Sequence, residues 1–169
     1  VSVDEYIEMI RLKTSVLLAA ALKIGACLAG ASVEDAEKLY DFGVSMGLAF
    51  QLQDDWLDVY GDPKVFGKNI GGDILCNKKT YMLITALNQA DDKQSEELQR
   101  WISATDAEPA DKITAVTHIY NEMRIGDQCM AMADSYYAEG LALLDGISLP
   151  AERKEMLKQF VCSLMNRKV

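Results

Sequence analysis

Three aspartates stand at the end of an apolar helical stretch, at the spacing of groups that share a cation. Asp54 and Asp58 are four residues apart and Asp55 and Asp58 are three apart, so on a helix all three carboxylates can converge on one point. Their charges repel one another, and the last turns of a helix carry the negative end of its dipole. Oxygen ligands without Cys or His select magnesium, or manganese, rather than zinc. The competing interpretation is a solvated acidic helix end.

A lysine-bearing loop follows the aspartates directly. Its four lysines lie within sixteen residues of a chain whose net charge is negative: Lys64, Lys68, Lys78 and Lys79. Lysine binds phosphate oxygens as a point charge, and magnesium in proteins often keeps substrate phosphates among its ligands. Glycines at positions 67, 71 and 72 would let the loop backbone approach an anion. Acids and lysines together predict a site for magnesium and a diphosphate, whereas the lysines taken alone would be better explained as solvated surface residues.

Lys13 and Thr14 form a second polar interruption, directly before a stretch that is apolar from Val16 to Leu22. A basic residue followed by a hydroxyl could face the same pocket as the aspartates. A lysine whose aliphatic stem snorkels out at a helix kink is the alternative.

The elements that position these residues are all predicted to be helices. Ser2 and Glu5 have capping-box spacing, which predicts a helix from about residue 3 to residue 30 with a kink around 13–15. Ser32 and Asp35 open a second helix that ends near residue 61, and Pro63 begins a loop over 62–79. Further helices are expected over 80–90, 93–103, 109–145 with a break at residue 126, and from 148–150 almost to the end. No stretch alternates as a strand would, so we expect one all-α domain over residues 1–169.

Composition narrows the class of partner. The chain has 169 residues, with 26 acids against 17 Lys and Arg and a net charge of −9, which disfavours nucleic acid and anionic membranes. Lys23 interrupts the longest apolar run, so no stable membrane insertion is expected. No signal peptide is visible, and four widely spaced cysteines are expected to be reduced and mostly buried. These features predict a cytoplasmic protein.

One extended pattern resembles a known family. It comprises Phe50-Gln51-Leu52-Gln53-Asp54-Asp55-Trp56-Leu57-Asp58, followed by Gly67-Lys68, Gly72-Asp73-Ile74 and Asn77-Lys78. This string is similar to the second aspartate-rich region of trans-isoprenyl diphosphate synthases, which include farnesyl and geranylgeranyl diphosphate synthases. Lys13-Thr14 resembles the Lys-Thr pair that the family carries upstream. A bare DDxxD would be a weak signal, but the combination at these intervals is specific.

The resemblance implies an isoprenoid synthase fold, here partial, with antiparallel helices around a central cavity. It also implies magnesium-dependent chain elongation, in which an allylic prenyl diphosphate ionises and the double bond of isopentenyl diphosphate attacks the cation. A homodimer in the cytoplasm is expected on the same ground.

The resemblance also assigns roles to single residues. Asp54 is the expected direct magnesium ligand, with Asp55 and Asp58 ligating the ion or holding its waters. The remaining assignments are allylic diphosphate binding by Lys13 and Lys68, substrate binding by Lys78, oxygen dipoles of Thr14 and Gln51 directed at the carbocation, and packing of Phe50 near isopentenyl diphosphate.

A departure from the family pattern bears on activity. The first aspartate-rich motif of the family, a second DDxxD or DDxxxxD, is not found in the sequence. We therefore expect the chain to be the C-terminal part of a synthase, inactive or nearly so by itself and prone to self-association. A non-catalytic subunit of the same fold is the alternative. A terpene cyclase or head-to-head synthase is a weaker one, because Gly67-Lys68 and Asn77-Lys78 fit chain elongation better.

Overall fold

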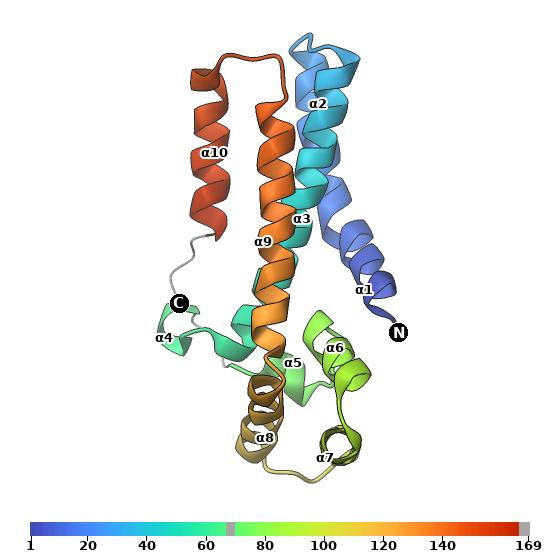
Figure 1. The fold of residues 1–169 in the computed structure, drawn as a ribbon. Coiled ribbons are helices and arrows are strands. Elements are labelled where there is room, and N and C mark those ends of the chain that lie inside the picture. Colours follow the sequence, from blue (N-terminus) through green and yellow to red (C-terminus); the bar gives the residue numbers. More distant parts are fainter. Residues whose placement is uncertain (67–69, 166–169) are drawn as a thin grey trace. The chain divides into compact units, whose positions relative to one another are not determined.

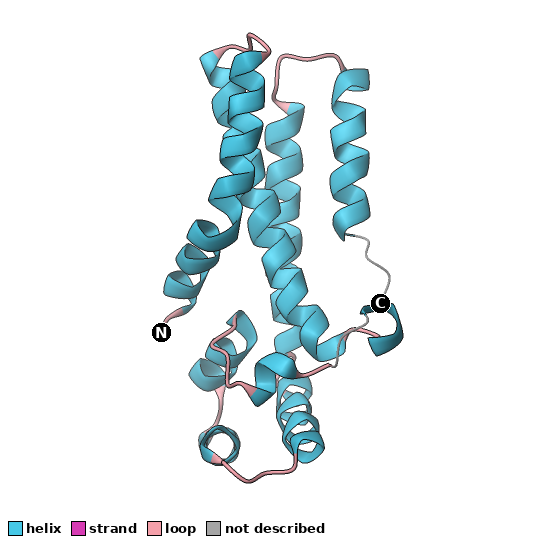
Figure 2. Cartoon of the chain, turned by 180° about the vertical axis from the view of Figure 1, so that it is seen from behind, coloured by secondary structure: helices cyan, strands magenta, loops and turns pink. Residues whose placement is uncertain are grey.

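The computed structural model describes residues 1–66 and 70–165, and every regular element in that part of the chain is a helix (Figure 2). The all-α prediction is therefore confirmed. The helices are α1 (Val3–Ile10), the π-helix η1 (Arg11–Ser15), α2 (Val16–Leu28), α3 (Val33–Tyr60), α4 (Pro63–Phe66), α5 (Gly72–Leu75), α6 (Tyr81–Gln89), α7 (Asp92–Ser103), α8 (Pro109–Glu122), α9 (Ile125–Asp145) and α10 (Ala151–Met165).

The helices divide into two compact units. The aspartate unit comprises Val1–Tyr6 and Asp54–Met130, and the cavity unit comprises Ile7–Gln53 and Ala131–Lys168. The long helices α3 and α9 each contribute residues to both units. Each unit has its own packing and is described by itself.

The cavity unit is built from helices that approach closely at glycine. Figure 1 shows α2, α10, the first part of α3 and the last part of α9 running side by side. A Cβ at Gly43 would lie 2.6 Å from the Cα of Ala19, and a Cβ at Gly47 would lie 2.5 Å from the Oγ of Ser15. These two glycines therefore let α3 pack directly against the backbone of η1 and α2. Beyond them, a buried apolar cluster joins α3, α9 and α10: Phe42, Met46, Leu144, Ile147 and Val161.

Polar contacts fix the connection between α9 and α10. The Lys38 ammonium group donates to the carbonyl of Gly146 at 2.9 Å, and the Ser148 N–H donates to the Asp35 carboxylate at 3.0 Å. Both acceptor–donor pairs join α3 to the turn before α10. The turn is thus held by side chains of the first two turns of α3.

The aspartate unit packs its short helices around α8 and the last turns of α3. Helix α8 contacts α5, α6 and α7. The interior of the aspartate unit contains side chains that are almost completely buried: Leu57, Met82, Leu98, Ile119 and Ile125. Helix α6 begins at Thr80, whose hydroxyl accepts from the Leu83 N–H, and α7 begins with a complete capping box between Asp91 and Gln94.

Most helix boundaries agree with the sequence expectations. The capping box of Ser2 and Glu5 is present, and the expected kink is the π-helix η1. Two boundaries were wrong. The predicted loop 62–79 contains the four-residue helices α4 and α5, and the break in 109–145 falls at Met123–Arg124, where Arg124 has a φ of 55°, instead of at residue 126.

The expected burial of the cysteines was also wrong. Cys129 is buried, whereas Cys27, Cys76 and Cys162 are exposed. Cys27 and Cys162 lie on α2 and α10, and Cys76 lies in the turn after α5, and composition does not reveal such positions. Within the described residues, no helix is long and apolar enough to cross a membrane.

The close approach of Gly47 to Ser15 leads to a prediction about stability. Gly47→Ala places a methyl group against Ser15 and is expected to lower the free energy of unfolding by about 1–3 kcal/mol. Gly25→Ala is the matched control, because Gly25 lies within α2 with open space around its Cα. It should raise the free energy of unfolding by about 0.5–1 kcal/mol through better helix propensity. Urea unfolding measures both, and equal effects would contradict the packing described here.

Candidate functional site

The aspartate unit buries one carboxylate of the acidic cluster completely. The side chain of Asp55 is 1% exposed, and its two oxygens accept from opposite partners. The Tyr6 hydroxyl donates to Oδ2, and the Lys78 ammonium group donates to Oδ1 at 3.1 Å. Burial raises the pKa of Asp55, against the opposing effect of the hydrogen bonds from Tyr6 and Lys78. A charge in this position is tolerated only because both oxygens are held.

Asp58 is tied to the loop instead. Its Oδ2 accepts the backbone N–H of Asp73 at 2.8 Å, and its own carbonyl accepts the N–H of Gly71 at 2.6 Å. Gly71 has a φ of +83°, which a residue with a Cβ rarely adopts. Burial also raises the pKa of Asp58, so two carboxyls of this helix end are disfavoured as anions in the chain without a cation.

Lys78 lies between two carboxylates. Its Nζ is 2.7 Å from Asp73 Oδ2 and 3.1 Å from Asp55 Oδ1, and its side chain remains 40% exposed. Burial lowers the pKa of Lys78, but the hydrogen bonds and charges of Asp73 and Asp55 outweigh it and the net direction is upward. Lys78 is therefore a cation that is held by two carboxylates and is still accessible to solvent.

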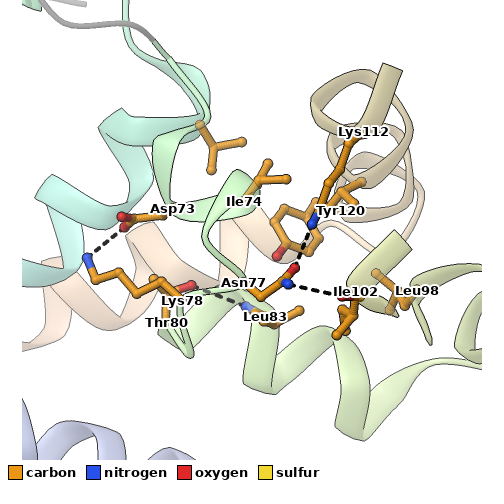
Figure 3. Close-up of a pocket in the computed structure, with 12 residues that line it drawn as sticks. Asp73, Ile74, Asn77, Lys78, Thr80, Leu83, Leu98, Ile102, Lys112 and Tyr120 are labelled. Atoms are coloured by element: carbon orange, nitrogen blue, oxygen red, sulfur yellow. Dashed lines mark hydrogen bonds and ion pairs between the residues drawn. The ribbon is translucent and has the colours of Figure 1, made fainter. Parts of the chain in front are cut away.

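Asn77 points away from Lys78 and anchors the loop (Figure 3). It has a φ of 50°, donates to the carbonyl of Ile102 at 3.0 Å and accepts from the buried ammonium group of Lys112 at 2.8 Å. The cavity beside it measures about 10 Å³, room for about one water. This cavity is too small for a substrate. The hydrogen bonds of Asn77 anchor the loop, and Lys78 next to it is directed toward Asp55 and Asp73.

The cavity unit contains the other predicted polar pair. The Thr14 hydroxyl donates to Gln51 Oε1 at 3.3 Å, and this hydrogen bond joins η1 to α3. Thr14 and Phe50 line a cavity of about 310 Å³. The rest of its wall is apolar: Leu18, Leu22, Phe42, Met46, Gly47, Leu157, Phe160, Val161, Leu164 and Met165. Such a lining suits a hydrocarbon with one polar end.

The remaining predicted residues are placed as follows. Asp54 lies half-buried on α3 in the aspartate unit, and Lys13 is exposed in the cavity unit. Lys68 falls outside the described residues. Within the described part of the chain, no group of three or more His, Cys, Asp or Glu side chains is arranged to hold a metal ion. The structure therefore does not bring the three aspartates together as a complete set of ligands.

The donor set is nevertheless compatible with magnesium. Asp54, Asp55 and Asp58 offer carboxylate oxygens, which are the ligands that magnesium prefers. Magnesium commonly binds through one or two carboxylates and takes its other ligands from water and phosphate. Asp54 and Asp58 are more exposed than Asp55 and would be the carboxylates to hold it.

Sequence reasoning missed Tyr6, Asp73 and Lys112 as parts of this arrangement. Tyr6 lies seven residues before Lys13, about two helical turns, and that spacing was the available signal. Asp73 stands in the quoted motif but had no role. Nothing in the sequence indicates that Lys112 reaches Asn77, 35 residues away.

Comparison with known proteins gives a consistent result. The family model described as polyprenyl synthetase matches residues 1–123. The chain is 35% identical over 159 residues to the short chain isoprenyl diphosphate synthase of Methanothermobacter thermautotrophicus, covering 94% of this chain and 45% of that protein. It is 34% identical over 167 residues to the geranylgeranyl diphosphate synthase of Methanosarcina mazei, covering 99% and 49%.

Solved structures agree. A crystal structure of geranylgeranyl pyrophosphate synthase superposes with a TM-score of 0.90 at 38% identity, over 100% of this chain and 53% of that one. A polyprenyl synthase from Caulobacter crescentus CB15, complexed with calcium and isoprenyl diphosphate, superposes with a TM-score of 0.86 at 30% identity, over 99% and 51%. The chain thus has the all-α isoprenoid synthase fold and spans about half the length of the relatives it matches.

The raised pKa of Asp58 predicts a pH dependence of stability without magnesium. An unfolded aspartate ionises near pH 3.9, and the folded Asp58 ionises above that value. Its contribution to the free energy of unfolding is therefore present below the unfolded pKa and lost as pH rises through the folded pKa. The difference in unfolding free energy between wild type and Asp58→Asn should fall as pH rises from about 4 to about 7.

Asp145→Asn is the control for this measurement. The hydrogen bond from Lys158 lowers the pKa of Asp145, so its contribution is present above the unfolded pKa and is lost as pH falls. In urea unfolding, the difference between wild type and variant should fall from about pH 4 to about pH 7 for Asp58→Asn, whereas for Asp145→Asn it should stay level or rise over that range. A shared slope would refute the assignment of Asp58.

Proposed function

Because the chain belongs to the polyprenyl synthetase family, we propose that it forms the C-terminal part of a magnesium-dependent prenyltransferase. The reaction is the condensation of an allylic prenyl diphosphate with isopentenyl diphosphate. The observation that carries the proposal is at the acidic end of α3, where the buried carboxylate of Asp55, together with Asp73 of α5, lies against the partly exposed ammonium group of Lys78. A site that joins acids to an accessible cation suits a metal–diphosphate ligand.

The three aspartates would have different roles in binding magnesium. Asp54 is the proposed direct ligand, and Asp58 would ligate the ion or hold its waters. Asp55 is 1% exposed, so it supports the site from beneath. When bound, magnesium neutralises charge on the diphosphate and makes it a better leaving group. Calcium and isoprenyl diphosphate in the Caulobacter structure support this assignment by analogy.

The basic and polar residues would bind substrate. Lys78 would contact diphosphate oxygens at the aspartate unit. The diphosphate-binding roles of Lys13 and Lys68 stay predictions from the sequence. Thr14 and Gln51 present side-chain oxygens that would stabilise positive charge on the allylic carbon, which is effective when the groups are preorganised in a dry site. Phe50 would pack near isopentenyl diphosphate.

The cavity of about 310 Å³ would accommodate the prenyl chain. Its volume is within the range of ligand pockets, roughly 300–1,000 Å³. Apolar side chains from α2, α3 and α10 surround it, and Thr14 is its one hydroxyl-bearing wall residue. Exclusion of water from such a cavity would protect a carbocation from hydrolysis.

The half-length match limits what this chain would do alone. It covers 45–53% of the four relatives named above. We propose that the first aspartate-rich motif and much of the isopentenyl site belong to a preceding segment of a longer protein. A non-catalytic subunit of the same fold remains the alternative, and the reading frame upstream of Val1 distinguishes the two. A cytoplasmic location stays a prediction from the sequence.

Turnover tests the metal assignment. In the complete protein that carries this chain, Asp54→Ala should reduce kcat/KM for condensation by about 100-fold or more, the scale for losing a group that stabilises developing charge. Asp91→Ala is the control, because Asp91 only caps α7, and it should cost about 1 kcal/mol of stability with turnover unchanged. Equal losses would refute the site. Absence of any condensation with magnesium and both substrates would refute the function.

Exposed apolar residues on α2 predict self-association of the isolated chain. Leu17, Ile24 and Leu28 are 77%, 60% and 85% exposed, and their spacing places them on one face of the helix. Soluble monomers rarely expose such a patch. Sedimentation should show oligomers, and Leu17→Lys with Leu28→Lys should shift the population toward monomer. Met156→Lys, which changes an exposed residue on α10, is the control. A wild-type chain that sediments as a monomer would contradict this prediction.

A further inference from the structure

Tyr6 lies in the acidic cluster of the aspartate unit although it belongs to no motif of the chain. Its side chain is 1% exposed, and its hydroxyl donates to Asp55 Oδ2 across 49 residues of sequence. A tyrosine that only filled the core could be replaced by phenylalanine without loss. The hydroxyl instead meets a buried carboxylate, where an unpaired oxygen would cost free energy.

The contacts form a chain from the interior to the surface. Tyr6 holds one oxygen of Asp55, the other oxygen holds the Lys78 ammonium group, and Asp73 holds that ammonium group from a second side. The exposed fraction increases along this path, from 1% for Asp55 to 40% for Lys78. Lys78 is the most exposed side chain of this path and is the one that a ligand can reach. The orientation of the Asp55 carboxylate therefore affects the position of the Lys78 ammonium group.

Tyr6 fixes that orientation. A carboxylate held on one oxygen alone can rotate about its terminal torsion, which is broad. A second donor on the other oxygen removes that freedom. Loss of the Tyr6 hydroxyl would remove the donor to Oδ2 of Asp55, and the carboxylate would hold the Lys78 ammonium group in a less defined position.

We propose that Tyr6 is a positioning residue of the diphosphate site: acting through Asp55, it holds Lys78 where that side chain meets the diphosphate of the substrate. This inference rests on the function proposed above. It assigns Tyr6 no contact with substrate and no part in proton transfer. It distinguishes Asp55, which is buried and orienting, from Asp54 and Asp58, which are more open.

Binding of magnesium with inorganic diphosphate tests the inference without turnover. In the complete protein that carries this chain, Tyr6→Phe should weaken this binding, measured by calorimetry well below the unfolding temperature, by about 10-fold or more. Outer partners of metal-site residues typically have effects of that size. Tyr60→Phe is the matched control. It removes another tyrosine hydroxyl of the same unit, which donates to Asn121 at 3.0 Å, and should leave binding unchanged.

A double-mutant cycle separates positioning from a general loss of stability. If Tyr6 acts through Asp55, the double variant Tyr6→Phe/Asp55→Asn should bind no more weakly than Asp55→Asn alone. Additive losses, or equal binding by Tyr6→Phe and wild type, would overturn the inference and leave the proposed function standing. Failure of the wild-type protein to bind magnesium and diphosphate would overturn both.

A further readout needs only the wild-type fold, in case Tyr6→Phe does not fold. 3-Fluorotyrosine at position 6 should change its fluorine resonance when magnesium and diphosphate are added, because the hydroxyl is linked through Asp55 to Lys78. The same label at position 60 should not respond. A silent label at position 6 with saturating ligand would count against the inference.

Discussion

The burial of the Asp55 carboxylate is the constraint on which the aspartate unit depends. A carboxylate that is 1% exposed requires donors on both oxygens, and here they are Tyr6 and Lys78, from opposite directions in the sequence. Satisfying this one group ties the first helix to the loop after α3. The loop backbone then closes on Asp58 through Gly71 and Asp73. The positive φ of Gly71 suits a residue without a Cβ, and the positive φ of Asn77 is offset by its hydrogen bonds to Ile102 and Lys112.

The cavity unit combines close helix packing with an internal cavity. Its helices pack closely at one level and leave space at another. Gly43 and Gly47 bring α3 against the backbone of α2 and η1, whereas larger side chains of α3 and α10 enclose a cavity of about 310 Å³. The π-helix at Arg11–Ser15 places Thr14 at the wall of this cavity, against Gln51. Irregular turns of this kind often occur at functional sites, and here the irregularity orients a hydroxyl.

Local signals accounted for most of the fold. The capping box at Ser2 and the N-cap at Ser32 predicted helix starts correctly, because each is an interaction within a few residues. The errors have a different origin. Helices α4 and α5 are four residues long, too short to carry a periodic pattern, and the break before α9 depends on Arg124 at positive φ, which no propensity indicates. The division into two compact units depends on contacts between residues far apart in the sequence.

For the site, the sequence by itself determined the chemistry of the groups: carboxylates at helical spacing, lysines after them, and a hydroxyl beside a lysine upstream. Those assignments depend only on residue type and short intervals along one helix or loop. The tertiary structure decided how the groups divide their roles. It buried Asp55, joined Asp58 to the loop, held Lys78 between two acids and placed Tyr6 beneath them. Residue spacing cannot supply this information, because burial and hydrogen-bond partners arise from chain segments that meet only in the folded protein.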